Sequence, residues 1–146
     1  MKALLQRVHS VKLEVEGSLF SSINKGILVF LGVEKKDSYS DINYIADKIV
    51  NLRIFEDEHQ KMNLSLKDID GELMVVSQFT LAGDTKKGRR PGFDNAMPPD
   101  EAEKIYCEFV NYISKNHNMK VKTGAFGKHM NISLINDGPV TFIIEK

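Results

Sequence analysis

The sequence predicts a strand-rich α/β protein in which two helices pack on a mixed sheet. Three observations lead to this fold class. Apolar runs with strand-like patterns lie toward both ends of the chain, two stretches have a helical period, and the order is strands, helix, strand, helix, strands. No internal repeat, low-complexity tract or linker divides the 146 residues, so we expect a single domain, residues 1–146, with one core.

The composition is that of a soluble globular protein, with 42% hydrophobic and 27% charged residues. Twenty basic residues balance twenty acidic ones, so a polyanion would have to bind a local patch rather than a global field. The N-terminus lacks the apolar stretch of a secretory signal, and no run is long enough to span a membrane. With a single cysteine no internal disulfide forms, which fits a reducing compartment. We therefore expect a cytoplasmic protein that does not bind membranes.

The N-terminal part of the chain is predicted to form strands. Val11, Leu13 and Val15 alternate with charged residues, which is typical of a strand with one buried and one solvated face. The run “ILVFLGV”, residues 27–33, is apolar throughout and indicates a strand covered on both faces. A turn is expected before it, at residues 24–26.

Two segments are predicted to be helices. Ser38 or Ser40 can cap the first, whose core-facing stripe comprises Ile42, Ile45, Ala46, Ile49 and Leu52. The second opens after Pro98-Pro99, where Pro99 or Asp100 suits a helix start, and its core-facing residues are Ala102, Ile105, Tyr106, Phe109 and Ile113. Cys107 lies in this helix without a basic neighbour to activate its thiol, and we expect it to pack in the core.

Further strands are predicted between and after the helices. Residues 53–57 begin one, and “ELMVVSQFTL”, residues 72–81, forms a buried one that precedes a long loop. Two or three strands follow the second helix, from “KVKTGAF”, “MNISLIN” and “VTFIIEK”. Gly138-Pro139 separates the last two. Such a pair usually marks a turn, but a glycine before a ring-locked residue can also form a stiff element that approaches a ligand closely.

The residues that chemistry could use give weaker signals. The histidines, His9, His59, His117 and His129, are too widely spaced to predict a metal site, and no cofactor motif is present. Ser77 and Thr80 are expected at the end of a buried strand, where functional sites often lie, yet the chain has no G-x-S-x-G elbow or recognisable triad. The two hydroxyls either satisfy backbone groups or serve an enzyme that depends on backbone dipoles and a positioned water.

Two further segments are candidates for contact with a nucleic acid. Four cations in “DTKKGRR”, Lys86, Lys87, Arg89 and Arg90, form either a solvated surface or a phosphate-facing patch. Phe126, flanked by small residues, is either part of the core or a face on which a base stacks.

Four motifs in order, “ALLQRV”, “SQFTL”, “TGAFGKHM” and “NDGPVT”, resemble those of the D-aminoacyl-tRNA deacylases, also called D-tyrosyl-tRNA deacylases. The resemblance extends over essentially the whole chain. One departure is “VKL” at residues 11–13, where the family often has Ala-Ser-Val. Inward alternation is kept there, so we expect no effect on function.

The resemblance implies a homodimeric hydrolase with active sites at the subunit interface and neither metal nor cofactor. It would cleave the ester that joins a D-amino acid to the 3′-terminal adenosine of tRNA. The family fold is strand-rich α/β, sheet on sheet and partly barrel-like, with two helices packed on one side. Ser77, Gln78, Phe79 and Thr80 would surround the ester. Thr80 would be a nucleophile, or the ribose 2′-hydroxyl would help to activate water, which is the route we favour.

The resemblance also implies how handedness is read. Gly138 and Pro139 would form a cis pair that enters the partner's pocket, with Arg7 helping to fix it. Such an element would exclude L side chains, and achiral glycine would pass. Phe126, Gly127 and Met130 would lie around the adenine, and Lys86, Lys87, Arg89 and Arg90 would contact tRNA phosphates. The alternatives are an RNA-binding module without catalysis and an esterase that depends on Ser77.

Overall fold

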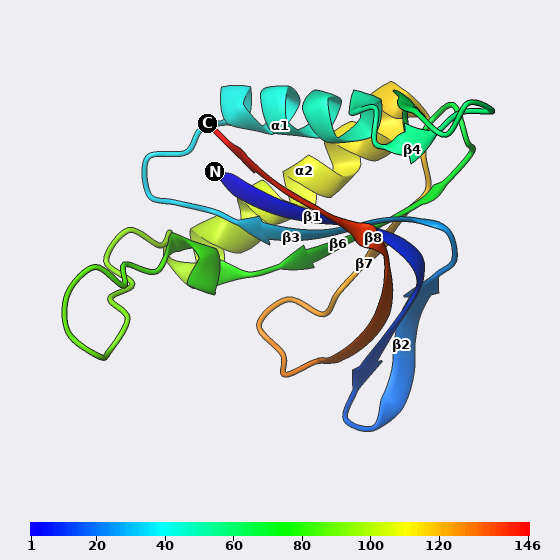
Figure 1. Cartoon of the computed structure of the whole chain (residues 1–146). Helices are drawn as coiled ribbons and strands as arrows, with labels where there is room; N and C mark the ends of the chain where they lie inside the picture. The colour runs from blue at the N-terminus through cyan, green and yellow to red at the C-terminus, as the bar shows by residue number, and fades with distance from the viewer.

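Strand β1 organises the fold, since three other strands pair with it in the computed structural model, which describes residues 1–146 (Figure 1). The elements are β1 (Lys2–Val15), β2 (Ser18–Ile23), β3 (Gly26–Gly32), α1 (Tyr39–Asn51), β4 (Phe55–Glu56), β5 (Met62–Leu64), β6 (Glu72–Ser77), the 3₁₀ helix η1 (Phe79–Ala82), α2 (Pro99–His117), β7 (Val121–Thr123) and β8 (Asn131–Glu145). Neither α-helix has the length and apolar character needed to cross a membrane.

The main sheet is mixed. Its order is β2-β1-β3-β6-β7, and β8 pairs with β1. β1 is antiparallel to all three of its partners, whereas β3, β6 and β7 are parallel to one another. β1 accommodates three partners because its first half pairs with β3 and its second half with β2, while β8 runs along most of its length. The sheet curls toward a barrel with both α-helices on one side, which confirms the predicted fold class (Figure 1).

Apolar side chains pack on both faces of the central strands. Ile27, Val29 and Leu31 of β3 belong to the larger core, which also takes in residues of α1 and α2. Leu28 of the same strand belongs to a smaller core that includes residues of β1 and β6. The prediction that residues 27–33 are covered on both faces is therefore confirmed.

The helices begin where their capping residues predict. The carboxylate of Asp41 accepts bonds from the backbone N–H of Ser38, at 2.7 Å, and from its hydroxyl, at 2.9 Å. These bonds to the charged form lower the pKa of Asp41. α2 begins at Pro99, whose ring suits a first helical position. The predicted stripes are buried with two exceptions: Leu52 follows the end of α1, and Ala102 is only partly buried.

Several details differ from the sequence predictions. One strand was missed: the segment “SLFSSI”, half serine and half apolar, forms β2. Cys107 is exposed, because the buried residues of α2 lie on the opposite side of the helix. The C-terminal runs that flank Gly138-Pro139 form the single strand β8 instead of two strands joined by a turn. β8 pairs with β1 before and after an irregularity, at which residues 137–140 have no partner in β1. A proline without an N–H is tolerated at such a place.

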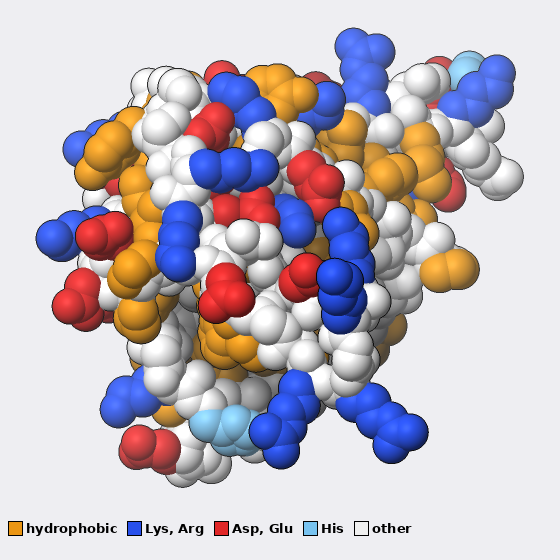
Figure 2. All heavy atoms as spheres, turned by 90° about the vertical axis from the view of Figure 1, so that its left-hand side faces the viewer, with side chains coloured by type: hydrophobic (Ala, Val, Ile, Leu, Met, Phe, Trp, Pro, Cys, Tyr) orange, Lys and Arg blue, Asp and Glu red, His pale blue; other side chains and the backbone are white.

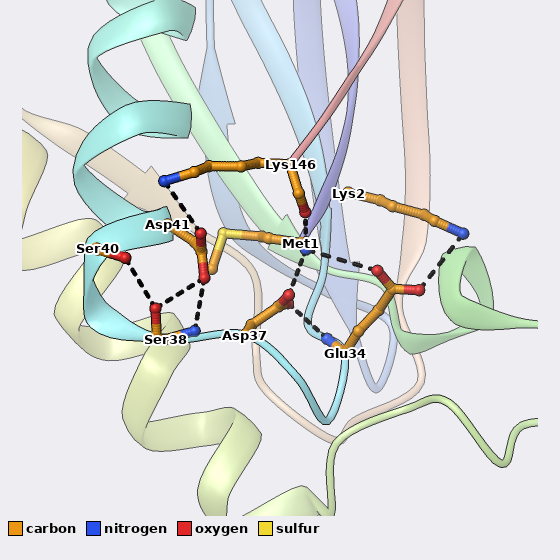
Figure 3. Close-up of polar contacts among 8 residues, drawn as sticks. All are labelled: Met1, Lys2, Glu34, Asp37, Ser38, Ser40, Asp41 and Lys146. Atoms are coloured by element: carbon orange, nitrogen blue, oxygen red, sulfur yellow. Dashed lines mark hydrogen bonds and ion pairs between the residues drawn. The ribbon is translucent and has the colours of Figure 1, made fainter.

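The two ends of the chain meet at one edge of the larger core (Figures 1 and 3). The buried Met1 ammonium donates to the Lys146 carbonyl at 3.0 Å and forms ion pairs with Asp37 and, at 3.5 Å, with Glu34. Asp37 also accepts a bond from the Glu34 N–H at 2.7 Å. This cluster fixes the segment that follows β3. The same segment binds the 95–97 backbone, since Lys35 N–H donates to Asn95 and Met97 N–H donates to Val33.

Candidate active site

A cleft of about 630 Å³ opens beside the end of β6. Its walls come from five parts of the chain: Val33 after β3, the end of β6 with the start of η1, the segment 93–98, the first turn of α2, and residues 126–132. Ser77, Gln78 and Phe79 line the cleft together with Phe126, Gly127 and Met130. The structure therefore brings together three of the four residues predicted for the ester and all three predicted for the adenine, which are almost fifty positions apart.

The parallel pairing of β6 with β3 positions the first group. Ser77 is the last residue of β6 and pairs with Leu31, whose carbonyl then accepts the Gln78 N–H at 2.8 Å. The chain turns there into η1, so that the backbone of residues 77–79 changes direction at the cleft wall. The first N–H groups of such a turn have no acceptor inside the helix. They are suitable donors for a substrate oxygen.

The hydroxyl groups are not arranged as a nucleophile with its base. Thr80 lies in η1 rather than in the strand, is exposed, and is not among the residues that line the cleft. Its hydroxyl accepts a bond from the Gln78 amide at 2.5 Å, and an amide cannot act as a base. No histidine or carboxylate bonds to the hydroxyl of Ser77 or Thr80. The arrangement favours water as the attacking group.

The side of the cleft where adenine is predicted to bind has a rigid support. Phe126 is half-buried and packs against Tyr106, with ring centroids 5.7 Å apart. The Tyr106 hydroxyl donates to the Val75 carbonyl at 2.7 Å, and burial raises the pKa of Tyr106. Gly127 has a φ of +70°, a conformation that L side chains rarely adopt. Phe126 thus serves both the core and the cleft wall.

Gly138 and Pro139 lie elsewhere. Both residues are exposed on β8 and do not line this chain's own cleft. Their peptide bond is cis, as the resemblance implies. The buried Arg7 holds Asp137, the residue before Gly138. The Arg7 Nε donates to the Asp137 carbonyl at 3.1 Å and lies 3.1 Å from the Asp137 carboxylate. Arg7 Nη1 also donates to the Ile54 carbonyl at 2.6 Å.

The basic loop is closed at its base by two backbone bonds between Asp84 and Gly92, of 2.8 and 2.9 Å. All four cations, Lys86, Lys87, Arg89 and Arg90, are exposed. A small polar hollow in the loop is lined by Lys87 and Arg90 together with Asp84 and Asp94. Figure 2 shows the side of the molecule toward which this loop projects, where Lys and Arg side chains alternate with Asp and Glu.

The sequence reasoning missed several residues that line the cleft, among them three with large or ionisable side chains. Phe93, Lys128 and His129 line it and are exposed. His129 and Lys128 lie inside the “TGAFGKHM” motif, so their position in that motif was a usable signal. Phe93 lies in an irregular loop, whose course no periodic pattern predicts. Nowhere in the structure do three or more His, Cys, Asp or Glu side chains converge as metal ligands.

Comparison with known proteins places this chain in a class of enzymes, the hydrolases that cleave aminoacyl esters of tRNA. A family model described as D-Tyr-tRNA(Tyr) deacylase matches residues 4–145, and the chain belongs to this family. A relative from Thermodesulfovibrio yellowstonii, named D-aminoacyl-tRNA deacylase, is 60% identical and covers 99% of this chain and 98% of its own. One of the same name from Thermosipho africanus is 59% identical, over 99% and 97% of the two chains.

A solved structure adds a second name. The c-Myc DNA Unwinding Element Binding Protein is 40% identical to this chain, covers 100% of it and 99% of its own chain, and superposes with a TM-score of 0.94. The fold is therefore shared by proteins whose names refer to different nucleic acids.

Proposed function

We propose that this protein hydrolyses the ester bond of D-aminoacyl-tRNA and releases free tRNA and the D-amino acid. The observation that carries the proposal is that two groups of residues line the same cleft: Ser77, Gln78 and Phe79 on one side, and Phe126 and Gly127 on another. A terminal adenosine at the second group brings its 3′ ester to the first. Because translation supplies the substrate, we also propose that the protein acts in the cytoplasm.

The chemistry requires little of the protein, because an aminoacyl ester is already activated. The Gln78 N–H is already bonded to Leu31, so the backbone N–H of Phe79 at the start of η1 stabilises the oxyanion that develops when water attacks the carbonyl carbon. The ribose 2′-hydroxyl orients that water and relays one of its protons to the departing 3′ oxygen of the adenosine, and the amino acid is released as a carboxylate after its carboxyl proton passes to solvent. The exposed position of Thr80 and its bond to Gln78 argue against a covalent intermediate on this residue.

Discrimination between D- and L-substrates is proposed to require a second subunit. Gly138 and Pro139 are exposed outside their own cleft, and Arg7 anchors the residue before them. Three large apolar side chains are also exposed on β8: Ile135, Phe142 and Ile143. We propose that β8 faces the partner in a homodimer and inserts Gly138-Pro139 into the partner's cleft. A backbone element there excludes L side chains by contact and accepts many D-amino acids, and glycine.

The basic loop is proposed to bind tRNA phosphates. Lys86, Lys87, Arg89 and Arg90 are exposed on the loop between Phe79 and Phe93, two residues that line the cleft, in a chain whose formal net charge is zero. Contacts of this kind position the polyanion without reading its sequence.

The test is the release of amino acid from matched D-tyrosyl-, L-tyrosyl- and glycyl-tRNA by the purified protein. We expect hydrolysis of the D-tyrosyl and glycyl esters and survival of the L-tyrosyl ester. Release from none of the three would indicate a nucleic-acid-binding module, and DNA binding would then be measured because of the name of the structural relative. Labelling of Ser77 by a serine-directed phosphonate, with hydrolysis of small esters, would indicate a serine esterase instead.

A further inference from the structure

Two aromatic side chains form an exposed pair at the rim of the cleft. The rings of Phe79 and Phe93 lie 5.1 Å apart at an interplanar angle of 60°, and the two residues are 57% and 39% exposed. Both line the cleft. The mechanism above uses the backbone of Phe79, but neither ring. Large aromatic rings exposed side by side at a cleft are typical of a binding surface.

The backbone holds this pair in place. The two bonds between Asp84 and Gly92 close the basic loop, so Phe93 follows immediately after the chain has returned to η1. Gly83 allows the approach, because a Cβ there would lie 3.1 Å from Phe93 Cε1 and 2.9 Å from the Thr80 carbonyl oxygen. The Phe93 carbonyl accepts the Ala96 N–H at 3.0 Å, which fixes the chain on the other side. The pair is preorganised rather than a chance contact of two loops.

The charge around the pair indicates its occupant. The loop that joins Phe79 to Phe93 carries Lys86, Lys87, Arg89 and Arg90, all exposed. Exposed aromatic faces beside a group of free cations are the combination by which proteins bind single-stranded nucleic acids: bases stack on the rings and phosphates approach the cations. An apolar peptide would not use the four charges.

We propose that the Phe79–Phe93 pair stacks the base of the nucleotide that precedes the terminal adenosine of the substrate. This inference rests on the proposed function, since it assumes the adenosine at Phe126. The cleft then has aromatic contacts for two successive bases, Phe126 for the last and the Phe79–Phe93 pair for the one before it. The phosphate between that nucleotide and its 5′ neighbour lies toward the cationic loop. Stacking tolerates any base, so the pair contributes affinity for a single-stranded end and no sequence preference.

The test compares substrates that differ only in the preceding nucleotides. Initial rates are measured with D-alanyl-adenosine, with D-alanyl-CCA trinucleotide and with D-alanyl-tRNA. Phe93→Leu removes the aromatic face and keeps most of the apolar volume, and Phe93→Tyr restores the ring. Phe20→Leu is the control, since Phe20 is 53% exposed on β2 and does not line the cleft.

We expect Phe93→Leu to lower kcat/KM about tenfold or more on the trinucleotide and on tRNA, to leave D-alanyl-adenosine unchanged, and Phe93→Tyr to recover the loss. An equal loss on D-alanyl-adenosine overturns the proposal, because the ring would then contact the aminoacyl group or support the ester site. Unchanged rates on all three substrates overturn it as well.

A binding measurement separates this inference from the function on which it rests. Uncharged CCA trinucleotide and adenosine are titrated into the wild-type and Phe93→Leu proteins. Weaker binding of the trinucleotide alone to the variant supports the pair as a nucleobase site even if no ester is hydrolysed. Equal binding of the trinucleotide to both proteins refutes the site even if D-aminoacyl-tRNA is a good substrate.

Discussion

Replacing Arg7 by Met tests the link between the buried guanidinium and the Gly138-Pro139 segment. The Arg7 side chain is only 6% exposed and donates to the carbonyls of Ile54 and Asp137. Its Nε also lies 3.1 Å from the Asp137 carboxylate. Methionine fills a similar volume without donating any hydrogen bond, so the change isolates the polar contacts from the packing.

The expected loss of stability follows from the groups left behind. Two carbonyls lose their donor: leaving the buried Ile54 carbonyl unsatisfied costs about 1–3 kcal/mol, and the partly buried Asp137 carbonyl costs less. The Asp137 carboxylate is 23% exposed, so water replaces part of its ion pair and adds at most about 1 kcal/mol. We expect the free energy of unfolding to fall by about 3 kcal/mol, a large part of the total stability of a domain this size.

The assay has two readouts. Urea unfolding gives the change in stability, and D-aminoacyl-tRNA hydrolysis is measured at a temperature at which the variant is folded. We expect kcat/KM to fall about tenfold or more, because Asp137 is no longer held by Arg7 and therefore no longer fixes the position of Gly138 and Pro139. Arg53→Met is the control, because Arg53 is exposed and its loss should change stability by less than about 0.5 kcal/mol. An Arg7 variant as stable and active as this control would refute the reasoning.

Three more predictions follow from the same kinds of contact. Asp37→Asn removes a carboxylate from the buried Met1 ammonium, and the free energy of unfolding measured in urea should fall by about 3 kcal/mol. The control Glu58→Gln, on the surface, should lower it by less than about 0.5 kcal/mol. Equally small losses in the two variants would contradict the prediction. Thr80→Ala should keep the rate of D-amino acid release within about threefold of wild type, and its abolition would restore the covalent route. The bonds from Ser38 lower the pKa of Asp41, so this carboxylate stabilises the fold above its ordinary pKa of 3.8 and loses that effect as the pH falls through its folded value. The difference in Tm between wild type and Asp41→Asn should therefore be present near about pH 6 and vanish near about pH 2, and a difference unchanged by pH would contradict the assignment.

Local sequence patterns predicted the elements whose formation depends mainly on their own residues. The helices and the doubly covered strand β3 follow from periodicity and caps, and both were confirmed. β2 was missed because three of its six residues, in “SLFSSI”, are serines and its apolar residues do not alternate with polar ones, and it forms through pairing with β1. The continuity of β8 likewise depends on its partner strand, which no local pattern in residues 131–145 reveals.

The sequence predicted most of the residues of the candidate site but not that they line one cleft. Ser77 and Phe126 were each open to a structural interpretation, and only the tertiary fold brings them into one cleft. The resemblance supplied the residues that belong together. Neither the residue patterns nor the resemblance predicted Phe93 at the cleft, because its position depends on how the 84–92 loop closes and on the absence of a side chain at Gly83.

The single thiol on the outer side of α2 makes this chain suitable for spectroscopy without further mutation. Cys107 is exposed and is not among the residues that line the cleft, so one maleimide dye or nitroxide can be attached per polypeptide away from the reacting groups. If two chains associate, they carry a matched pair of probes related by symmetry. The spacing between those probes, read by energy transfer or dipolar coupling, follows assembly directly and in the presence of RNA.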